Sequence, residues 1–127
     1  MPNLQINRTI YVTIWRMVEI REYLGSDGQN SFREWFDRLN SEAARKVTAA
    51  LYRVGLGNFS NVKGVGSGVF ECRIDFGPGY RVYFGKDGEQ FVILLCGGTK
   101  KRQQNDIELA TECWRDYKLR KRSGSCR

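Results

Sequence analysis

The residues of this chain that could do chemistry are mostly cationic. The sequence has 21 Lys and Arg residues, four cysteines and no histidine. The cysteines are far apart without a C-x-x-C pair, so we expect no zinc site and no other metal site. The formal net charge of +7 favours a polyanionic partner, either a nucleic acid or an acidic protein.

Two arginines are expected to meet on neighbouring strands. From residue 69 to 76 side chains alternate between apolar and polar, which puts Arg73 on the same side as Glu71 and Asp75. A glycine-proline-glycine turn then leads into a second alternating stretch, with Arg81 and Tyr83 on one side. If the two strands pair, Arg73 lies near Arg81. The alternative is a surface ion-pair ladder in which Arg73 is balanced by a neighbouring carboxylate.

The surrounding sequence indicates the elements that hold these residues. Periodicity and turn residues predict a strand over 18–21, helices over 31–39 and 41–54, strands over 69–76, 80–84 and 91–96, and a helix over 103–117. Ser31 and Glu34 are expected to form a capping box at the start of the first helix. The glycine-rich residues 58–68 are expected to form a loop that carries Lys63.

We expect one domain at residues 17–118, an N-terminal extension at 1–16 and a basic, frayed tail beyond it at 119–127. Three cysteines fall at apolar positions of predicted elements and should be buried free thiols, whereas Cys126 in the tail should be accessible. No signal peptide or membrane-spanning run is recognisable, so we expect a cytoplasmic protein that makes no contact with a membrane.

The element order, the stretch from Val69 to Phe84 and the stretch from Leu94 to Lys101 together resemble the RelE/ParE toxin superfamily. The resemblance points to its HigB-like branch of phage-derived addiction-module killer proteins. It implies an α+β fold: a small antiparallel-dominated sheet with an N-terminal αα-hairpin and a C-terminal helix in the order β-α-α-β-β-β-α. It also implies a basic concave sheet face with the helices packed behind it, and a cognate antitoxin as partner.

Most members of that superfamily are ribosome-dependent messenger-RNA endoribonucleases, so the resemblance implies messenger RNA and the ribosome as further partners. Attack of a 2′-hydroxyl on the neighbouring phosphate needs a proton acceptor, neutralisation of the developing charge and a proton for the leaving oxygen. Without histidine these tasks fall to Arg, Lys, Tyr or a carboxylate, and we expect no metal and no small-molecule cofactor.

Arg81 and the cluster of residues 100–102 follow from the same resemblance, and the other site residues from their charge and their place on the predicted strands and loops. We expect a catalytic group made of Arg81, Arg73, Tyr83 and Lys101, with Arg81 at the Gly-Tyr-Arg position of the family. Tyr83 is expected to stack on a base or donate a proton, although plain packing is an equal alternative. The residues expected to bind RNA are Lys63, Lys86, Lys100 and Arg102.

The chain departs from the family pattern at the acid and base. The tyrosine near the start of the last helix of RelE has no clear counterpart here, since Gln103, Gln104 and Asp106 fill that region. A histidine used by some HigB relatives is also missing, so the acid and base stay unassigned, with Glu71, Lys63, Lys86 and Tyr83 as the possibilities. Two alternatives therefore stay open: a non-catalytic toxin that inhibits DNA gyrase, as ParE does, and a degenerate phage-derived protein that binds nucleic acid or antitoxin without being toxic.

Overall fold

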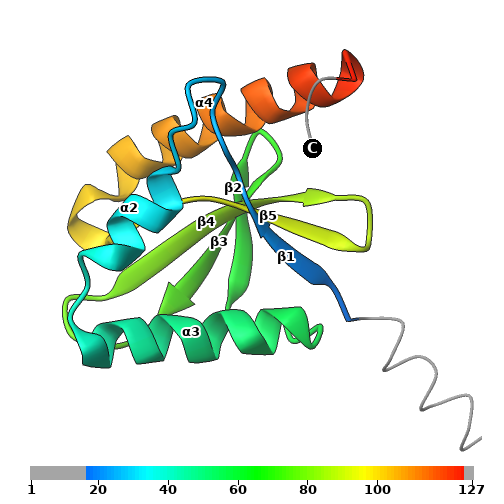
Figure 1. Ribbon diagram of the computed structural model, residues 1–127. Helices are drawn as coiled ribbons and strands as arrows, with labels where there is room; N and C mark the ends of the chain where they lie inside the picture. Colours follow the sequence, from blue (N-terminus) through cyan, green and yellow to red (C-terminus); the bar gives the residue numbers. More distant parts are fainter. Residues whose placement is uncertain (1–16, 125–127) are drawn as a thin grey trace, which may run out of the picture.

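The computed structural model describes residues 17–124, and Figure 1 shows their arrangement. In chain order the elements are β1 (Glu19–Glu22), α2 (Ser31–Asp37), α3 (Ser41–Gly55), β2 (Val62–Gly66), β3 (Val69–Ile74), β4 (Tyr80–Asp87), β5 (Phe91–Thr99), a 3₁₀ turn η1 (Lys100–Arg102) and α4 (Gln103–Arg122). The five strands form one sheet in the order β1-β5-β4-β3-β2. The β1–β5 pair is parallel and the other three pairs are antiparallel. The predicted α+β fold is confirmed.

Strand β2 corrects the prediction that residues 58–68 form only a loop. It pairs antiparallel with β3, with an irregularity between Gly64 and Gly66. Glycines hid the strand because they have low strand propensity, and here the neighbouring strand supplies the order. The glycines near the following turn are needed for the backbone, since Gly66, Ser67 and Gly68 all have positive φ.

Asparagines begin both helices of the hairpin. The side chain of Asn30 accepts a hydrogen bond from the backbone amide of Arg33 at 2.9 Å, and Asn40 accepts one from Ala43 at 2.9 Å. The predicted capping box at Ser31 is therefore wrong by one residue, because Asn30 is the cap and Ser31 is the first helical residue.

Helices cover both faces of the sheet. Around Phe84 and Val82, α2 and α3 pack on one face, whereas α4 packs on the other face around Tyr83 and Leu95. Figure 1 shows α3 and α4 on opposite sides of the strands. The expectation that all helices lie behind an open basic face is therefore wrong. Strands β4 and β5 are buried on both sides along most of their length, so each face needs a cover.

Helix α4 continues to Arg122, so the prediction of a frayed tail over 119–127 is wrong for residues 119–122. Its last turns are anchored to the body of the protein. The hydroxyl of Tyr117 donates to Asp87 at 2.6 Å, and Lys121 forms an ion pair with the same carboxylate. The three cysteines expected as buried free thiols (Cys72, Cys96 and Cys113) are confirmed, and Cys126 and the extension 1–16 lie outside the described residues.

Two helix tryptophans pack directly against glycines of the sheet. A Cβ atom on Gly97 would lie 2.2 Å from the ring of Trp35 in α2, and one on Gly85 would lie 2.4 Å from the ring of Trp114 in α4. No real side chain fits at such distances, so these strand glycines allow the indole rings to lie directly against the backbone.

We predict that Gly97→Ala and Gly85→Ala each destabilise the protein by about 1–3 kcal/mol, because the added methyl group forces the indole ring away from the strand. Urea unfolding followed by circular dichroism measures the effect. Gly64→Ala is the matched control, since a Cβ there would lie 3.8 Å from Phe70, an ordinary contact. An equal loss of stability in all three variants would mean that strand glycines matter here only through the backbone.

Candidate nucleic-acid interface

Arg73 and Arg81 lie directly opposite each other on β3 and β4. Their side chains share the sheet face that α4 partly covers, together with the adjacent Glu71–Tyr83 pair. The predicted pairing of the two arginines is confirmed. Gly98 of β5 lies opposite Arg81 on the other side, so three neighbouring strands bring Arg73, Arg81 and a residue without a side chain into one row.

A buried glutamate organises this row. The Oε1 atom of Glu71 lies 3.5 Å from Nε of Arg81, and the side chains are only 1% and 8% exposed. The same oxygen accepts a hydrogen bond from Nε2 of Gln103, the first residue of α4, at 2.8 Å. Glu71 therefore joins β3, β4 and the start of α4, and it fixes the direction of the Arg81 side chain.

The ion-pair ladder considered for Arg73 does not form. Glu71 pairs with Arg81, and Arg73 forms no ion pair with any carboxylate of residues 17–124. Arg73 is exposed, whereas Arg81 is buried. The row therefore contains one arginine fixed by its own counterion and one whose charge is open to a ligand.

The three cations before α4 lie at the same end of the sheet. The backbone amide of Lys100 donates to the carbonyl of Gly79 in the β3–β4 turn at 2.9 Å, which ties η1 to the strands that carry the arginines. Lys100, Lys101 and Arg102 are all exposed. No side chain caps the start of η1 or of α4, so backbone amides at that end add to the positive potential.

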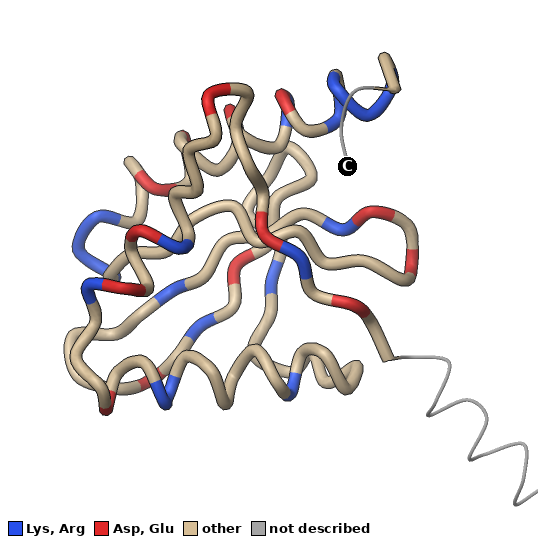
Figure 2. Tube along the Cα trace, viewed as in Figure 1, with Lys and Arg blue, Asp and Glu red and all other residues tan. Residues whose placement is uncertain are grey.

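The two remaining lysines have different positions. Lys63 lies opposite Glu71 on β2, on the same face as the arginine row but in the neighbouring row with Glu71 and Tyr83. Lys86 does not share this face, because its ammonium group lies 4.4 Å and 4.5 Å from the ring centres of Phe59 and Phe70, which belong to the α2–α3 side. Figure 2 shows basic segments side by side on β2, β3 and β4 and another in the turn before α4.

Tyr83 is enclosed rather than open to a ligand. Its side chain is 0% exposed and its hydroxyl has no hydrogen-bond partner in the described structure. Burial, followed by the charges of Glu71 and Asp106, raises the pKa of Tyr83, so the phenol keeps its proton at neutral pH. In this arrangement the tyrosine contributes packing, and base stacking or proton transfer by Tyr83 would require α4 to move.

Asp106 is a residue of the site that the sequence analysis did not identify as functional. Its side chain packs against Gly98, where a Cβ would lie 1.9 Å from Oδ2, and this buried oxygen has no hydrogen-bond partner in the described structure. The spacing of residues 106, 110, 113 and 117, all buried along α4, was the signal in the sequence for an inward-facing carboxyl group. No sequence pattern marks Gln103, because its role is to donate a hydrogen bond to Glu71, which is far away in the chain.

Residues 17–124 contain neither a metal-binding cluster nor a membrane-spanning helix. No three His, Cys, Asp or Glu side chains in this range are grouped so that they could hold a metal ion. None of the helices described here is long and apolar enough to cross a membrane.

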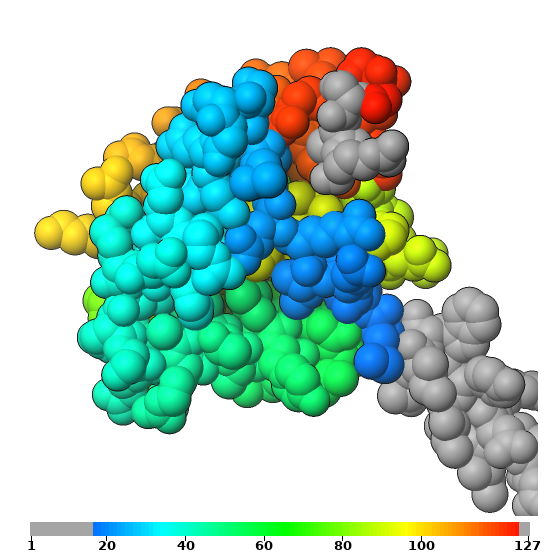
Figure 3. Space-filling view, in the orientation of Figure 1, coloured from blue at the N-terminus to red at the C-terminus, as the bar shows by residue number. Residues whose placement is uncertain are grey.

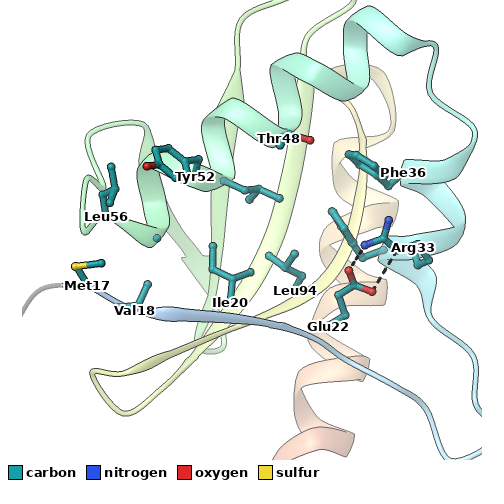
Figure 4. A pocket seen from close by; sticks show the side chains of 13 residues that line it. Met17, Val18, Ile20, Glu22, Arg33, Phe36, Thr48, Tyr52, Leu56 and Leu94 are labelled. Carbon is teal, nitrogen blue, oxygen red and sulfur yellow. Dashed lines mark hydrogen bonds and ion pairs between the residues drawn. The ribbon is translucent and has the colours of Figure 1, made fainter.

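A separate apolar groove lies on the opposite sheet face, where β1 meets α2 and α3 (Figures 3 and 4). Met17, Tyr52 and Leu56 line it and are 53%, 68% and 45% exposed. One end is closed by the ion pair between Glu22 and Arg33, which Figure 4 marks. This lining suits contact with an apolar partner surface rather than phosphate binding.

We predict that Asp106→Asn makes the protein more stable at pH 8 but leaves its stability nearly unchanged at about pH 3. Burial raises the pKa of the Asp106 carboxyl, opposed by the charge of Arg102, so ionisation costs stability in the folded chain. In the wild type, the contribution of the Asp106 carboxyl to folding stability is therefore fully present below the ordinary carboxyl pKa. It is lost as the pH rises through the raised pKa of the folded protein. Urea unfolding at both pH values measures the difference. A pH-independent effect of Asp106→Asn would contradict the prediction.

Comparison with known proteins agrees with this structure. Residues 34–115, more than half of the chain, match the family described as phage-derived protein Gp49-like (DUF891). An uncharacterized protein of Haemophilus influenzae (strain KW20 / Rd) is 46% identical over 81 residues, which cover 63% of this chain and 82% of that relative. The narrower HigB-like assignment stays a prediction. The chain therefore belongs to the phage-derived Gp49-like family, a family of RelE-like toxins.

Proposed function

We propose that this protein is the toxin of a type II toxin-antitoxin system and that it cleaves messenger RNA at the ribosome. Family membership supports the toxin assignment. The observation that carries the RNA assignment is the Arg73–Arg81 pair on adjacent strands, with η1 fastened to the neighbouring turn. This arrangement concentrates cations from separate segments on an area suited to a phosphodiester.

The proposed chemistry relies on charge and position. The scissile phosphate binds beside Arg73 and Arg81, whose guanidinium groups neutralise the charge that develops when the 2′-hydroxyl attacks phosphorus. Glu71 holds Arg81 in place, so little reorganisation accompanies the reaction. The attack forms the O2′–P bond and breaks the P–O5′ bond, which leaves a 2′,3′-cyclic phosphate; the 2′-hydroxyl proton passes to solvent water. Lys101, exposed in η1, is the proposed proton donor to the leaving 5′ oxygen. Lys63, Lys100 and Arg102 hold the adjoining RNA backbone.

A second candidate function is nucleic-acid binding without cleavage. Two observations favour it: Arg81 already has a buried counterion, and Tyr83 is enclosed. Such a protein would bind RNA through Arg73 and η1 but would leave transcripts intact. Cleavage measured on ribosome-bound messages separates it from the first proposal.

We predict that Arg73→Ala lowers ribosome-dependent cleavage by about a hundredfold or more, because an open guanidinium is removed from the phosphate. The variant should fold normally, since Arg73 is exposed and outside the ion pair of Glu71. Arg81→Lys, which keeps a charge beside Glu71 but removes the guanidinium, should also reduce cleavage strongly. Primer extension on messages translated in vitro gives the readout.

The matched control for this experiment is Arg45→Ala, an exposed arginine on α3. It removes the same charge from a surface away from the arginine row and should cleave like the wild type. Wild-type protein that leaves messages intact while inducing DNA damage would overturn the proposal in favour of gyrase inhibition. Intact messages without toxicity would favour the binding protein.

We further propose that the apolar groove beside β1 receives an amphipathic helix of the antitoxin. Strand β1 lies at the edge of the sheet, and large apolar side chains are exposed next to it. A partner seated there would cover these side chains and leave the arginine row to be blocked by another segment of the same chain. Neutralisation would then combine an apolar anchor with a charged cover.

We predict that Tyr52→Asp weakens binding of the protein encoded beside this toxin by about tenfold or more, because a charge is placed in the groove. Isothermal titration of the purified pair measures it. Ala49→Asp is the control, since Ala49 is exposed on the same helix but does not line the groove. Equal affinities for the two variants would exclude this groove as the docking site.

A further inference from the structure

A second hollow lies at the far end of α4, where the helix meets the β4–β5 hairpin. It encloses about 550 Å³. The residues that line it are Lys86, Asp87, Trp114, Tyr117, Lys118, Lys121 and Arg122. Four of the seven are cations. The ammonium group of Lys86 lies over Phe59 and Phe70 on the other sheet face, so the charges of the hollow come from Lys118, Lys121 and Arg122 of α4. We call this the C-terminal groove.

The single carboxylate in the lining does not balance these charges. Asp87 accepts a hydrogen bond from Tyr117 and forms an ion pair with Lys121. These contacts lower the pKa of Asp87, so it stays ionised and committed to them. Lys118 and Arg122 form no ion pair with any carboxylate of residues 17–124, and both are exposed. The groove therefore has a net positive charge.

Helix capping explains only part of this cluster. Cations in the last turn of a helix are favoured by its dipole, and Lys121 and Arg122 fit that role. The dipole gives no reason for Lys118, which lies before the last turn of α4, or for a hollow between the cations. A ligand with distributed negative charge accounts for both.

The aromatic floor indicates which part of a nucleic acid would bind. Trp114 and Tyr117 stack on each other at 5.2 Å with an interplanar angle of 8°. They are only 6% and 7% exposed, and the ammonium group of Lys118 lies 5.7 Å from the Trp114 ring centre. Since neither ring offers an open face to a base, the groove suits phosphates rather than bases.

We propose that the C-terminal groove is a second binding site for the RNA backbone, distinct from the arginine row. Lys121 follows Gln103 by 18 positions in α4, which corresponds to about 27 Å along the helix. Figure 2 shows the basic end of α4 far from the basic turn that precedes the helix. The proposal rests on RNA being the target. The backbone belongs either to ribosomal RNA or to a distant part of the message.

The test is the salt dependence of RNA binding by the triple variant Lys118→Ala, Lys121→Ala and Arg122→Ala. Losing up to three phosphate contacts should reduce the slope of log affinity against log salt by about 2 for single-stranded RNA, and lower affinity about tenfold or more at low salt. Fluorescence anisotropy with a labelled single-stranded RNA measures both. The matched control removes three exposed charges elsewhere: Arg38→Ala, Arg45→Ala and Arg53→Ala.

A charge-retaining variant and a second ligand, the purified ribosome, separate the possible causes of weaker binding. A charge-retaining variant, Lys118→Arg, Lys121→Arg and Arg122→Lys, should bind like the wild type, which excludes a folding defect as the cause. Weaker binding to purified ribosomes but not to the free RNA supports ribosomal RNA as the source, and the reverse supports the message. Equal slopes for the triple variant and its arginine control, on both ligands, would overturn the proposal.

Failure here is distinguishable from failure of the proposed function. Binding is measured in the Arg73→Ala background, where cleavage is removed and the C-terminal groove is intact. Suppose the groove variant shows the expected decrease in the salt slope in the Arg73→Ala background, while the wild type does not cleave messages. This result would reject the nuclease proposal but keep the second RNA site. Cleavage by the wild type, with no slope change in the groove variant, would keep the nuclease proposal and reject the second RNA site.

Discussion

The buried carboxylate of Glu71 is the constraint on which much of this structure depends. It pairs with Arg81 on the next strand and accepts a hydrogen bond from Gln103 at the start of α4. Enclosing two charges is costly, and the cost is offset only when both have good partners. Here one glutamate ties the sheet to the helix that covers it, and thereby sets where η1 and its cations lie relative to the arginine row.

The glycines of β4 and β5 determine how closely the helices approach. Trp35 lies on Gly97 from one side, Trp114 lies on Gly85 from the other, and Asp106 lies on Gly98. Because these contacts fasten a helix to each face, the middle of the sheet is closed to ligands. On the α4 side of the sheet, the end near the β3–β4 turn stays accessible, where Arg73 and η1 are exposed, and so does the C-terminal groove at the opposite end of α4.

Polar groups without hydrogen bonds concentrate beneath the first turns of α4. The Nε atom of Arg81, the hydroxyl of Tyr83 and Oδ2 of Asp106 are buried and lack hydrogen bonds in the described structure. Buried groups of this kind reduce stability, and proteins retain them mostly where function needs them. Their position under α4 therefore makes the contact between this end of the helix and the sheet less stable than a fully hydrogen-bonded one.

The sequence by itself determined the features that depend on local geometry. Alternation along two strands is enough to put Arg73 and Arg81 on one face, and helical spacing is enough to find the apolar sides of α3 and α4. It did not determine β2, whose order comes from β3, or the burial of Tyr83, which depends on α4 crossing that face. The separation of Lys86 from the arginine row and the length of α4 beyond Tyr117 were likewise decided by long-range contacts. Residues far apart in the chain make these contacts, so a local sequence pattern cannot predict them.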